Sequence, residues 1–413
     1  MLALGEYTLE EIPATRRDAL LQQVGDWYRN DPSSGVHGAA GWLLRHWGQN
    51  DVVREVDQTP VPYSTDREWF TLAITVTPTS PPKPAEKASD ENATPDAEST
   101  APPRAEGAAA QDEATEQKDE SDIAQPAKDE AKPEPLPPKT FYYTFIVFPA
   151  GDSQIGSFGN EPDRQKEEFR HGVTLTRPFA LLDREITFEE LIAFSPQYAG
   201  FMQQFDSKPE DAGFATHWYD SVTFCRWLSQ QSGLTETDQS YADPESLDEK
   251  EYPRDPNPDT SWAPRDWPLE LGRRGFRLPT ESEWEVASRT GSRTAYGYGS
   301  DVGLLDRFGW FIENSGKHVH PPREQRPGSR GLFDMHGNLF EWTHDWFGDY
   351  GNGEASLVDP LGPKGGSNHA SRGGSWFFGS TFCRSAYRII GTPPFRTGGG
   401  GFRVALSPSG IPK

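Results

Sequence analysis

The chain has 413 residues, of which 34% are apolar, and a formal net charge of −23 at pH 7. Nucleic acids and anionic membrane surfaces are bound through clustered Lys and Arg, so this acidic balance predicts neither as a partner. The two cysteines are too few for a disulfide framework.

The first residues of the chain lack both the basic segment and the apolar segment of a secretory signal. No apolar run in the sequence approaches the ~20 residues that are needed to span a bilayer. We therefore expect a cytoplasmic protein without a membrane anchor.

Residues 1–58 are predicted to form a helical N-terminal segment. Apolar side chains recur at helical spacing in Thr15–Arg29 and in Ser33–Trp47, and a third short helix is predicted at Asp51–Val56. Thr15 is the expected N-cap of the first helix. The amphipathic pattern favours a cap that packs on the following domain, and the alternative is a docking surface for another domain.

A long acidic segment separates two strand-like segments. Residues 78–138 contain no aromatic residue and are rich in Pro, Ala, Glu, Asp and Lys. Such a composition buries too little apolar surface to offset its ordering entropy, which predicts a disordered linker. Glu68–Val76, within residues 67–77, and Thr140–Phe148 are rich in aromatic and β-branched residues and are predicted strands.

The remaining residues, 139–408, alternate short strand-like segments with many glycines. Amphipathic patterns predict three helices, at Phe188–Phe194, Trp218–Gln231 and Ser282–Arg289. Thr280 is the expected N-cap of the last helix, and Glu283 completes a capping box with it. Asp238–Asp266 is polar and rich in proline, which predicts an irregular insertion.

Three spaced motifs follow one another in this region. They are R-L-P-T-E-S-E-W-E-V-A-S-R at Arg277–Arg289, G-L-F-D-M-H-G-N-L-F-E-W at Gly331–Trp342, and R-G-G-S-W-F-F-G-S-T-F-C-R-S-A-Y-R followed by G-F-R-V-A from Arg372. In this order they resemble the formylglycine-generating enzyme (sulfatase-modifying factor) family. The resemblance extends over roughly residues 145–406 and implies an α+β, C-type-lectin-like fold rich in irregular structure. It also implies that the two predicted strands pair as a hairpin, with the linker inserted at its tip.

The resemblance implies a catalytic region in the R-G-G-S block. Enzymes of this family oxidise a substrate cysteine to formylglycine with oxygen, using two cysteines five positions apart that bind copper(I). This chain has only Cys383 there, and Phe378 stands where the other cysteine would fall. Because a single thiolate is a poor copper(I) site, we do not expect copper. Aligned backward from R-S-A-Y-R, Cys383 instead precedes a family arginine.

Cys383 and Ser375 are the catalytic candidates that this resemblance gives. Ser375 follows a double glycine, so the alternative is a strand with a close backbone approach. Cys383 and Cys225 are otherwise expected to be buried free thiols, unless the fold brings them together. The neighbouring arginines are expected to pair with Glu283, Glu285 or Glu341.

The D-M-H-G-N-L-F-E-W motif carries the metal prediction. By resemblance, the side chains of Asp334 and Glu341 and the carbonyls of Gly337 and Leu339 would bind calcium, which prefers oxygen ligands of this kind. The alternative is that Gly337 forms a tight turn while Glu341 caps neighbouring backbone groups.

Two functions remain open from the sequence. The first is an oxygen-dependent enzyme that modifies a cysteine in sulfatases. The second is a pseudoenzyme, a lectin-like module that binds a protein or peptide without catalysis, and the missing cysteine favours it. The sequence predicts no oligomeric state and identifies no particular substrate.

Overall fold

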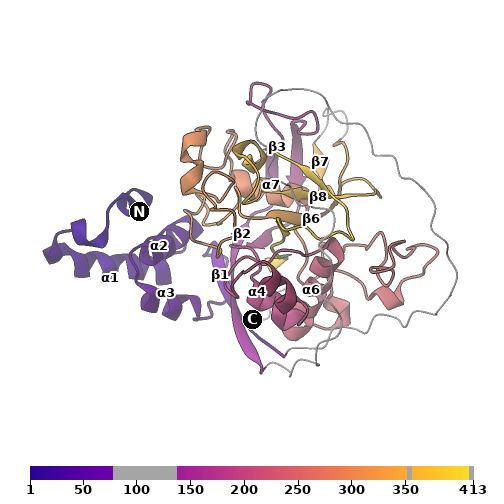
Figure 1. Ribbon diagram of the computed structural model, residues 1–413, viewed down its shortest axis with the longest axis horizontal. Helices are drawn as coiled ribbons and strands as arrows, with labels where there is room; N and C mark the ends of the chain where they lie inside the picture. Colours follow the sequence, from indigo (N-terminus) through magenta and orange to yellow (C-terminus); the bar gives the residue numbers. More distant parts are fainter. Residues whose placement is uncertain (78–136, 351–355, 409–413) are drawn as a thin grey trace.

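The computed structural model describes residues 1–77, 137–350 and 356–408 (Figure 1). The linker predicted at 78–138 lies outside the described residues except for its last two positions. Short helices and strands alternate with long turns and loops, which confirms an α+β fold rich in irregular structure. Within the described ranges, every helix is too short or too polar to cross a bilayer.

Three helices open the chain and form a unit at one side of the molecule (Figure 1). They are α1 (Ala14–Asn30), α2 (Ser34–His46) and α3 (Asn50–Asp57), preceded by 3₁₀ turns at Leu2–Glu6 and Leu9–Glu11. The predicted N-cap was wrong: α1 starts one residue before Thr15, after Pro13, whose fixed φ suits a helix start. Leu43 and Leu44 are fully buried and share an apolar cluster with Phe333 of the main domain. The helical unit therefore packs on the rest of the protein.

The predicted hairpin is confirmed. Strands β1 (Trp69–Val76) and β2 (Lys139–Phe148) pair antiparallel along the whole of β1, from Trp69 opposite Ile146 to Val76 opposite Lys139. They form a four-stranded sheet in the order β1-β2-β5-β11, completed by β5 (Phe179–Leu182) and β11 (Ala405–Leu406). Large aromatic side chains of β1 and β2 enter the main core, because alternate residues of a strand point to the same face.

Four helices follow this sheet: α4 (Phe188–Phe194), α5 (Tyr198–Gln204), α6 (Trp218–Gln231) and α7 (Glu281–Arg289). The predicted capping box of α7 is confirmed, since Glu283 N–H donates to Thr280 Oγ1 at 3.1 Å and Thr280 N–H donates to Glu283 Oε2 at 2.9 Å. Asp238–Asp266 contains no α-helix or named strand, and its 3₁₀ turns lie at Glu236–Asp238 and Pro244–Ser246. The predicted irregular insertion is therefore confirmed.

Two further sheets position the sequence motifs. One has the order β10-β6-β8-β9, formed by β10 (Gly400–Gly401), β6 (Phe340–Trp346), β8 (His369–Arg372) and β9 (Ile389–Gly391). The other has the order β3-β4-β7, formed by β3 (Gly151–Ile155), β4 (His171–Leu175) and β7 (Leu357–Val358). Further 3₁₀ turns lie at Val302–Arg307 and Ser380–Cys383. In the first sheet Glu341 lies opposite Arg372, so the D-M-H-G-N-L-F-E-W and R-G-G-S blocks lie side by side.

Candidate functional site

The R-G-G-S block leaves β8 through two glycines in the left-handed region. Gly373 has φ +103° and Gly374 has φ +81°, a conformation that favours residues without a β-carbon. A β-carbon on Gly374 would lie 2.5 Å from the sulfur of Cys383. The double glycine therefore lets the chain turn while packing directly against the cysteine.

Beyond the glycines, the block presents a continuous row of aromatic rings. We call Trp376, Phe377, Phe378, Phe382 and Tyr387 the aromatic row; all five are half-buried. Successive ring centroids are 4.7, 4.7, 4.8 and 4.9 Å apart, which is normal for contacting aromatic pairs.

Neighbouring loops hold the aromatic row in place. Trp376 N–H donates to Asn338 O at 2.9 Å, and the indole N–H of Trp376 donates to Gly398 O at 3.0 Å. A large apolar side chain beside the row is more than half exposed: Ile312, whose N–H donates to Phe378 O, at 51%. The row and Ile312 leave apolar surface exposed to solvent.

The two catalytic candidates lie below this surface. Ser375 and Cys383 are both fully buried. Ser375 Oγ has no hydrogen-bond partner and is packed so tightly that a β-carbon on Gly399 would lie 2.5 Å from it. Burial, reinforced by the charge of Glu313, raises the pKa of the Cys383 thiol well above its usual range. Neither residue has the features of an activated nucleophile.

The two cysteines do not meet. Cys225 lies on α6 in the main apolar core, whereas Cys383 belongs to a separate cluster with Tyr296 and Phe311. Both are free thiols, and burial raises the pKa of Cys225 as well. At the position of the missing cysteine, the Phe378 ring packs edge-on against Phe340. These residues do not fit a two-thiolate copper(I) site.

The D-M-H-G-N-L-F-E-W block forms a buried charged cluster. Arg403 donates to both carboxylate oxygens of Glu341 at 2.6 Å, and the Trp284 indole N–H adds a third bond at 2.9 Å. Asp334 Oδ2 accepts from Arg323 N–H at 2.9 Å, while its Oδ1 is buried without a partner. Glu341 is thus held by side chains, not by the backbone groups of the alternative interpretation.

A third carboxylate, which no sequence pattern singled out, joins this cluster. Glu185 accepts from Asn338 Nδ2 at 2.8 Å and from Leu339 N–H at 3.2 Å. Burial, followed by the charges of Asp334 and Glu341, raises the pKa of Glu185 well above its usual range. Burial also raises the pKa of Asp334 to about 7. The only available signal was the position of Glu185 in L-L-D-R-E-I-T, a segment that also fits the family.

The cluster partly fits a calcium ion. Asp334 Oδ1 is an open acceptor, and Glu341 Oε1 accepts a single bond and keeps a lone pair. Arg403 already supplies a positive charge beside them, which opposes a cation. The described ranges contain no group of three or more His, Cys, Asp and Glu suited to a metal. Calcium binding by Asp334, Glu341 and the two carbonyls stays a prediction.

The arginines of the R-G-G-S block and of G-F-R-V-A all have acidic partners, but only two of the partners were predicted. Arg372 pairs with Glu285 and Arg403 with Glu341, as expected, whereas Arg388 pairs with Glu281 at 2.6 Å. Arg384 is held by Glu161 at 2.8 Å and by Glu168 at 2.6 Å. These charge-assisted bonds, which are bidentate for Arg388, Arg403 and the Arg384–Glu168 pair, fix the backbone of the R-G-G-S block.

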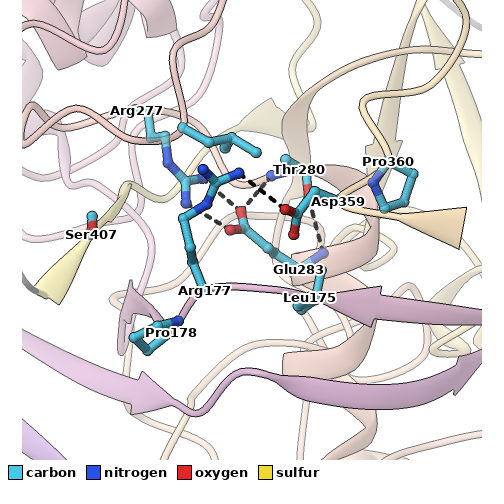
Figure 2. A pocket seen from close by; sticks show the side chains of 10 residues that line it. Leu175, Arg177, Pro178, Arg277, Thr280, Glu283, Asp359, Pro360 and Ser407 are labelled. Atoms are coloured by element: carbon cyan, nitrogen blue, oxygen red, sulfur yellow. Dashed lines mark hydrogen bonds and ion pairs between the residues drawn. The ribbon is translucent and has the colours of Figure 1, made fainter.

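Figure 2 shows a small pocket beside the α7 N-terminus. Arg277 pairs there with Glu283 at 2.6 Å, and Arg177 pairs with Asp359 at 3.0 Å. Because each of these charged side chains forms an ion pair with its neighbour, none of the four is free to bind a ligand. We therefore assign no ligand to this pocket.

Comparison with known proteins agrees with this architecture. Residues 131–408 match the Sulfatase-modifying factor enzyme 1-like domain. The formylglycine-generating enzyme of Streptomyces coelicolor is 36% identical over 146 residues, covering 32% of this chain and 46% of that enzyme. The enzyme of the same name from Thermomonospora curvata is 33% identical over 152 residues, covering 32% of this chain and 50% of that enzyme.

The chain thus spans about half the length of these curated relatives. Among solved structures, Treponema denticola variable protein 1 superposes with a TM-score of 0.54 at 27% identity, covering 64% of this chain and 95% of that protein. The domain match includes all three motifs and two thirds of the sequence. This chain therefore belongs to the sulfatase-modifying factor enzyme 1-like family.

Proposed function

We propose that the domain binds a protein or peptide along the aromatic row and does not oxidise cysteine. The observation that carries this proposal is the pair of residues at the positions of the catalytic cysteines. Phe378 is an aromatic ring in contact with its neighbours, and Cys383 is a fully buried thiol whose pKa is raised. Copper(I) chemistry needs two accessible thiolates, and this site supplies none.

The exposed apolar surface supports binding. Half-buried aromatic side chains contribute large contact areas at low cost in conformational entropy, which is why they are enriched in protein interfaces. The row is also anchored through Trp376 to Asn338 and Gly398, so little ordering is required when a ligand arrives. The family relationship supports a polypeptide ligand, since the named relatives act on a protein residue.

The oxidase is the competing function, and one experiment separates the two. We expect the reduced protein to show no tight copper(I) binding and to form no aldehyde on a cysteine-containing sulfatase peptide. Phe378→Cys recreates the five-residue spacing and serves as a gain-of-copper variant. Copper-dependent aldehyde formation by the unmodified chain, lost in Cys383→Ala, would overturn the proposal.

Binding is tested by selecting displayed random peptides on the full chain. We expect the selected peptides to bind the unmodified chain and to lose affinity for Trp376→Ala. Val358→Ala is the matched control, because Val358 is 63% exposed and lies on β7, outside the aromatic row. Peptides that bind Trp376→Ala as well as the unmodified chain would show that the row is not the binding surface.

We further propose a reducing, cytoplasmic location. Both cysteines are free thiols, which suits a compartment in which disulfides are rare.

A further inference from the structure

Two arginines near the C-terminal end of α7 lack an acidic partner. Within the described residues, the side chains of Arg170 and Arg293 make neither a hydrogen bond nor an ion pair. Arginines in the adjacent motifs form ion pairs with carboxylates, as Arg384 does with Glu168. Arg170 is half-buried and Arg293 is exposed, so both guanidinium groups can be reached by a ligand.

A third arginine holds the backbones of these two close together. Arg289 donates to Gly156 O at 2.9 Å and to Thr294 O at 3.0 Å. Gly156 packs on the backbone of Arg170, where a β-carbon on the glycine would lie 2.7 Å from Arg170 Cα. Thr294 directly follows Arg293. The backbones of Arg170 and Arg293 are therefore both held next to the Arg289 guanidinium.

One of the two guanidinium groups is already oriented. The guanidinium carbon of Arg170 lies 3.6 Å from the centroid of the Phe158 ring. Such stacking restrains the guanidinium and leaves its N–H groups free to donate. Burial, and then the positive charges of Arg293 and Arg289, lower the pKa of Arg170, so the like charges are close enough to repel.

The arginines of the buried network behind them are already paired. Glu285 pairs with Arg289 at 2.7 Å and also with Arg372. Glu281 pairs with Arg388 at 2.6 Å and lies 3.5 Å from Arg372. Arg384 in turn pairs with two glutamates, Glu161 and Glu168, so the four buried arginines of this network are matched by four glutamates. The buried network therefore supplies no carboxylate to spare for Arg170 or Arg293.

This surface adjoins the aromatic row. Tyr296 Oη donates to Ser380 O at 3.0 Å, and Ser385 N–H donates to Ala295 O at 2.8 Å. The segment just after Arg293 therefore lies against the part of the R-G-G-S block that carries Phe382.

We propose that Arg170 and Arg293 form a binding subsite for an oxyanion, a phosphate monoester or a carboxylate, carried by a peptide that lies along the aromatic row. Guanidinium groups bind both oxyanions in bidentate geometry, and an anion would relieve the repulsion between the two arginines. That the carrier is a peptide rests on the proposed function, whereas the anion subsite itself does not.

Inorganic phosphate tests the subsite without any peptide. In titrations of the full chain at constant ionic strength, we expect saturable phosphate binding. We expect Arg293→Ala and Arg170→Ala each to weaken binding about tenfold, the loss of one charge-assisted contact. Arg16→Ala is the charge-matched control, because Arg16 is an exposed residue of α1, outside the site. Trp376→Ala should leave phosphate binding intact, so failure of the peptide proposal remains distinguishable.

Peptides then identify the carrier group. In the peptides selected above, an acidic residue is replaced by phosphoserine. Tighter binding of the phosphorylated peptide would identify phosphate as the preferred anion, and unchanged binding would identify carboxylate. Absence of saturable phosphate binding, or equal affinity in Arg293→Ala, would overturn the subsite. A lower melting temperature of Arg293→Ala without phosphate would also overturn it, because an unpaired arginine should contribute no stability.

Discussion

Asp57, the last residue of α3, lies 3.5 Å from Arg323 of the main domain, whose guanidinium also donates to Asp183 at 2.6 Å. Asp57 additionally accepts from Arg45 at 2.7 Å and from the hydroxyl of Tyr28. Burial opposes ionisation, but the charges of Arg45 and Arg323 lower the pKa of Asp57 to about 2. This ionic network joins the N-terminal helices to the main domain.

We therefore expect Asp57→Asn to lower the free energy of unfolding, because Arg45 and Arg323 lose a shared counter-charge. Since Asp57 retains a quarter of its side-chain exposure, the effect should be about 2 kcal/mol, less than for a fully buried pair. Urea unfolding at pH 7 measures it. The control is Asp51→Asn, which removes an exposed pair with Arg54 and should change stability by less than about 1 kcal/mol. Equal effects of the two variants would contradict an ionic link between the domains.

Buried histidines should make the fold sensitive to acid. Gly297 N–H donates to His336 Nε2 at 3.0 Å, so this nitrogen must keep its lone pair, while Nδ1 lies 2.9 Å from Cys383 O. Burial lowers the pKa of His336 to about 4, below its unfolded value of about 6.5. The unfolded chain thus binds more protons between these values, and stability is lost as the pH falls from 6.5 toward 4.

Urea unfolding at pH 7.5 and pH 5 measures this loss. His336→Gln should reduce the difference between the two pH values by about 2 kcal/mol, the linkage expected over that range. His46→Gln is the control, since His46 is exposed. Burial lowers the pKa of other histidines as well, so part of the dependence should remain; they are His37, His171, His217, His344 and His369. A variant with the full wild-type difference would exclude His336 as a cause.

Calcium removal tests the cluster around Asp334. If calcium binds there, a chelator should lower the melting temperature, because a ligand that binds only the native state stabilises it by mass action. Asp334→Asn should abolish this response, and Asp18→Asn, an exposed acid on α1, should retain it. A melting curve that is indifferent to chelator would leave Glu341 as the partner of Arg403 alone.

The hairpin predicts that the long connection between β1 and β2 is dispensable for stability. Val76 lies directly opposite Lys139, so residues 77–138 can be replaced by Asn-Gly, the preferred two-residue hairpin turn. We expect an unchanged or higher melting temperature, because a shorter loop loses less entropy on closure. A large loss of stability in calorimetry would show that the removed residues pack on the domain.

Local features of the fold could be predicted from the sequence. The capping box of Thr280 and Glu283 and the exact bounds of Phe188–Phe194 and Trp218–Gln231 depend on contacts within a turn or two of chain. The three motifs lie far apart in the chain, but they follow one another in the order typical of the family. For this reason the fold could be inferred from the sequence, together with the strand pairing across residues 78–138. Thr15 was the local error, since the helix begins at Ala14, directly after Pro13.

Only the tertiary structure decided which charges meet. Glu185 reaches Asn338 across 153 positions, and no sequence period links residues so far apart. The path of the chain likewise separates Cys225 from Cys383 and brings Arg170 beside Arg293. Sequence patterns record the local backbone preferences and the face that each element buries. Long-range electrostatic contacts depend on how the elements pack. The ion pairs and pKa shifts of the site could therefore be identified only from the tertiary structure.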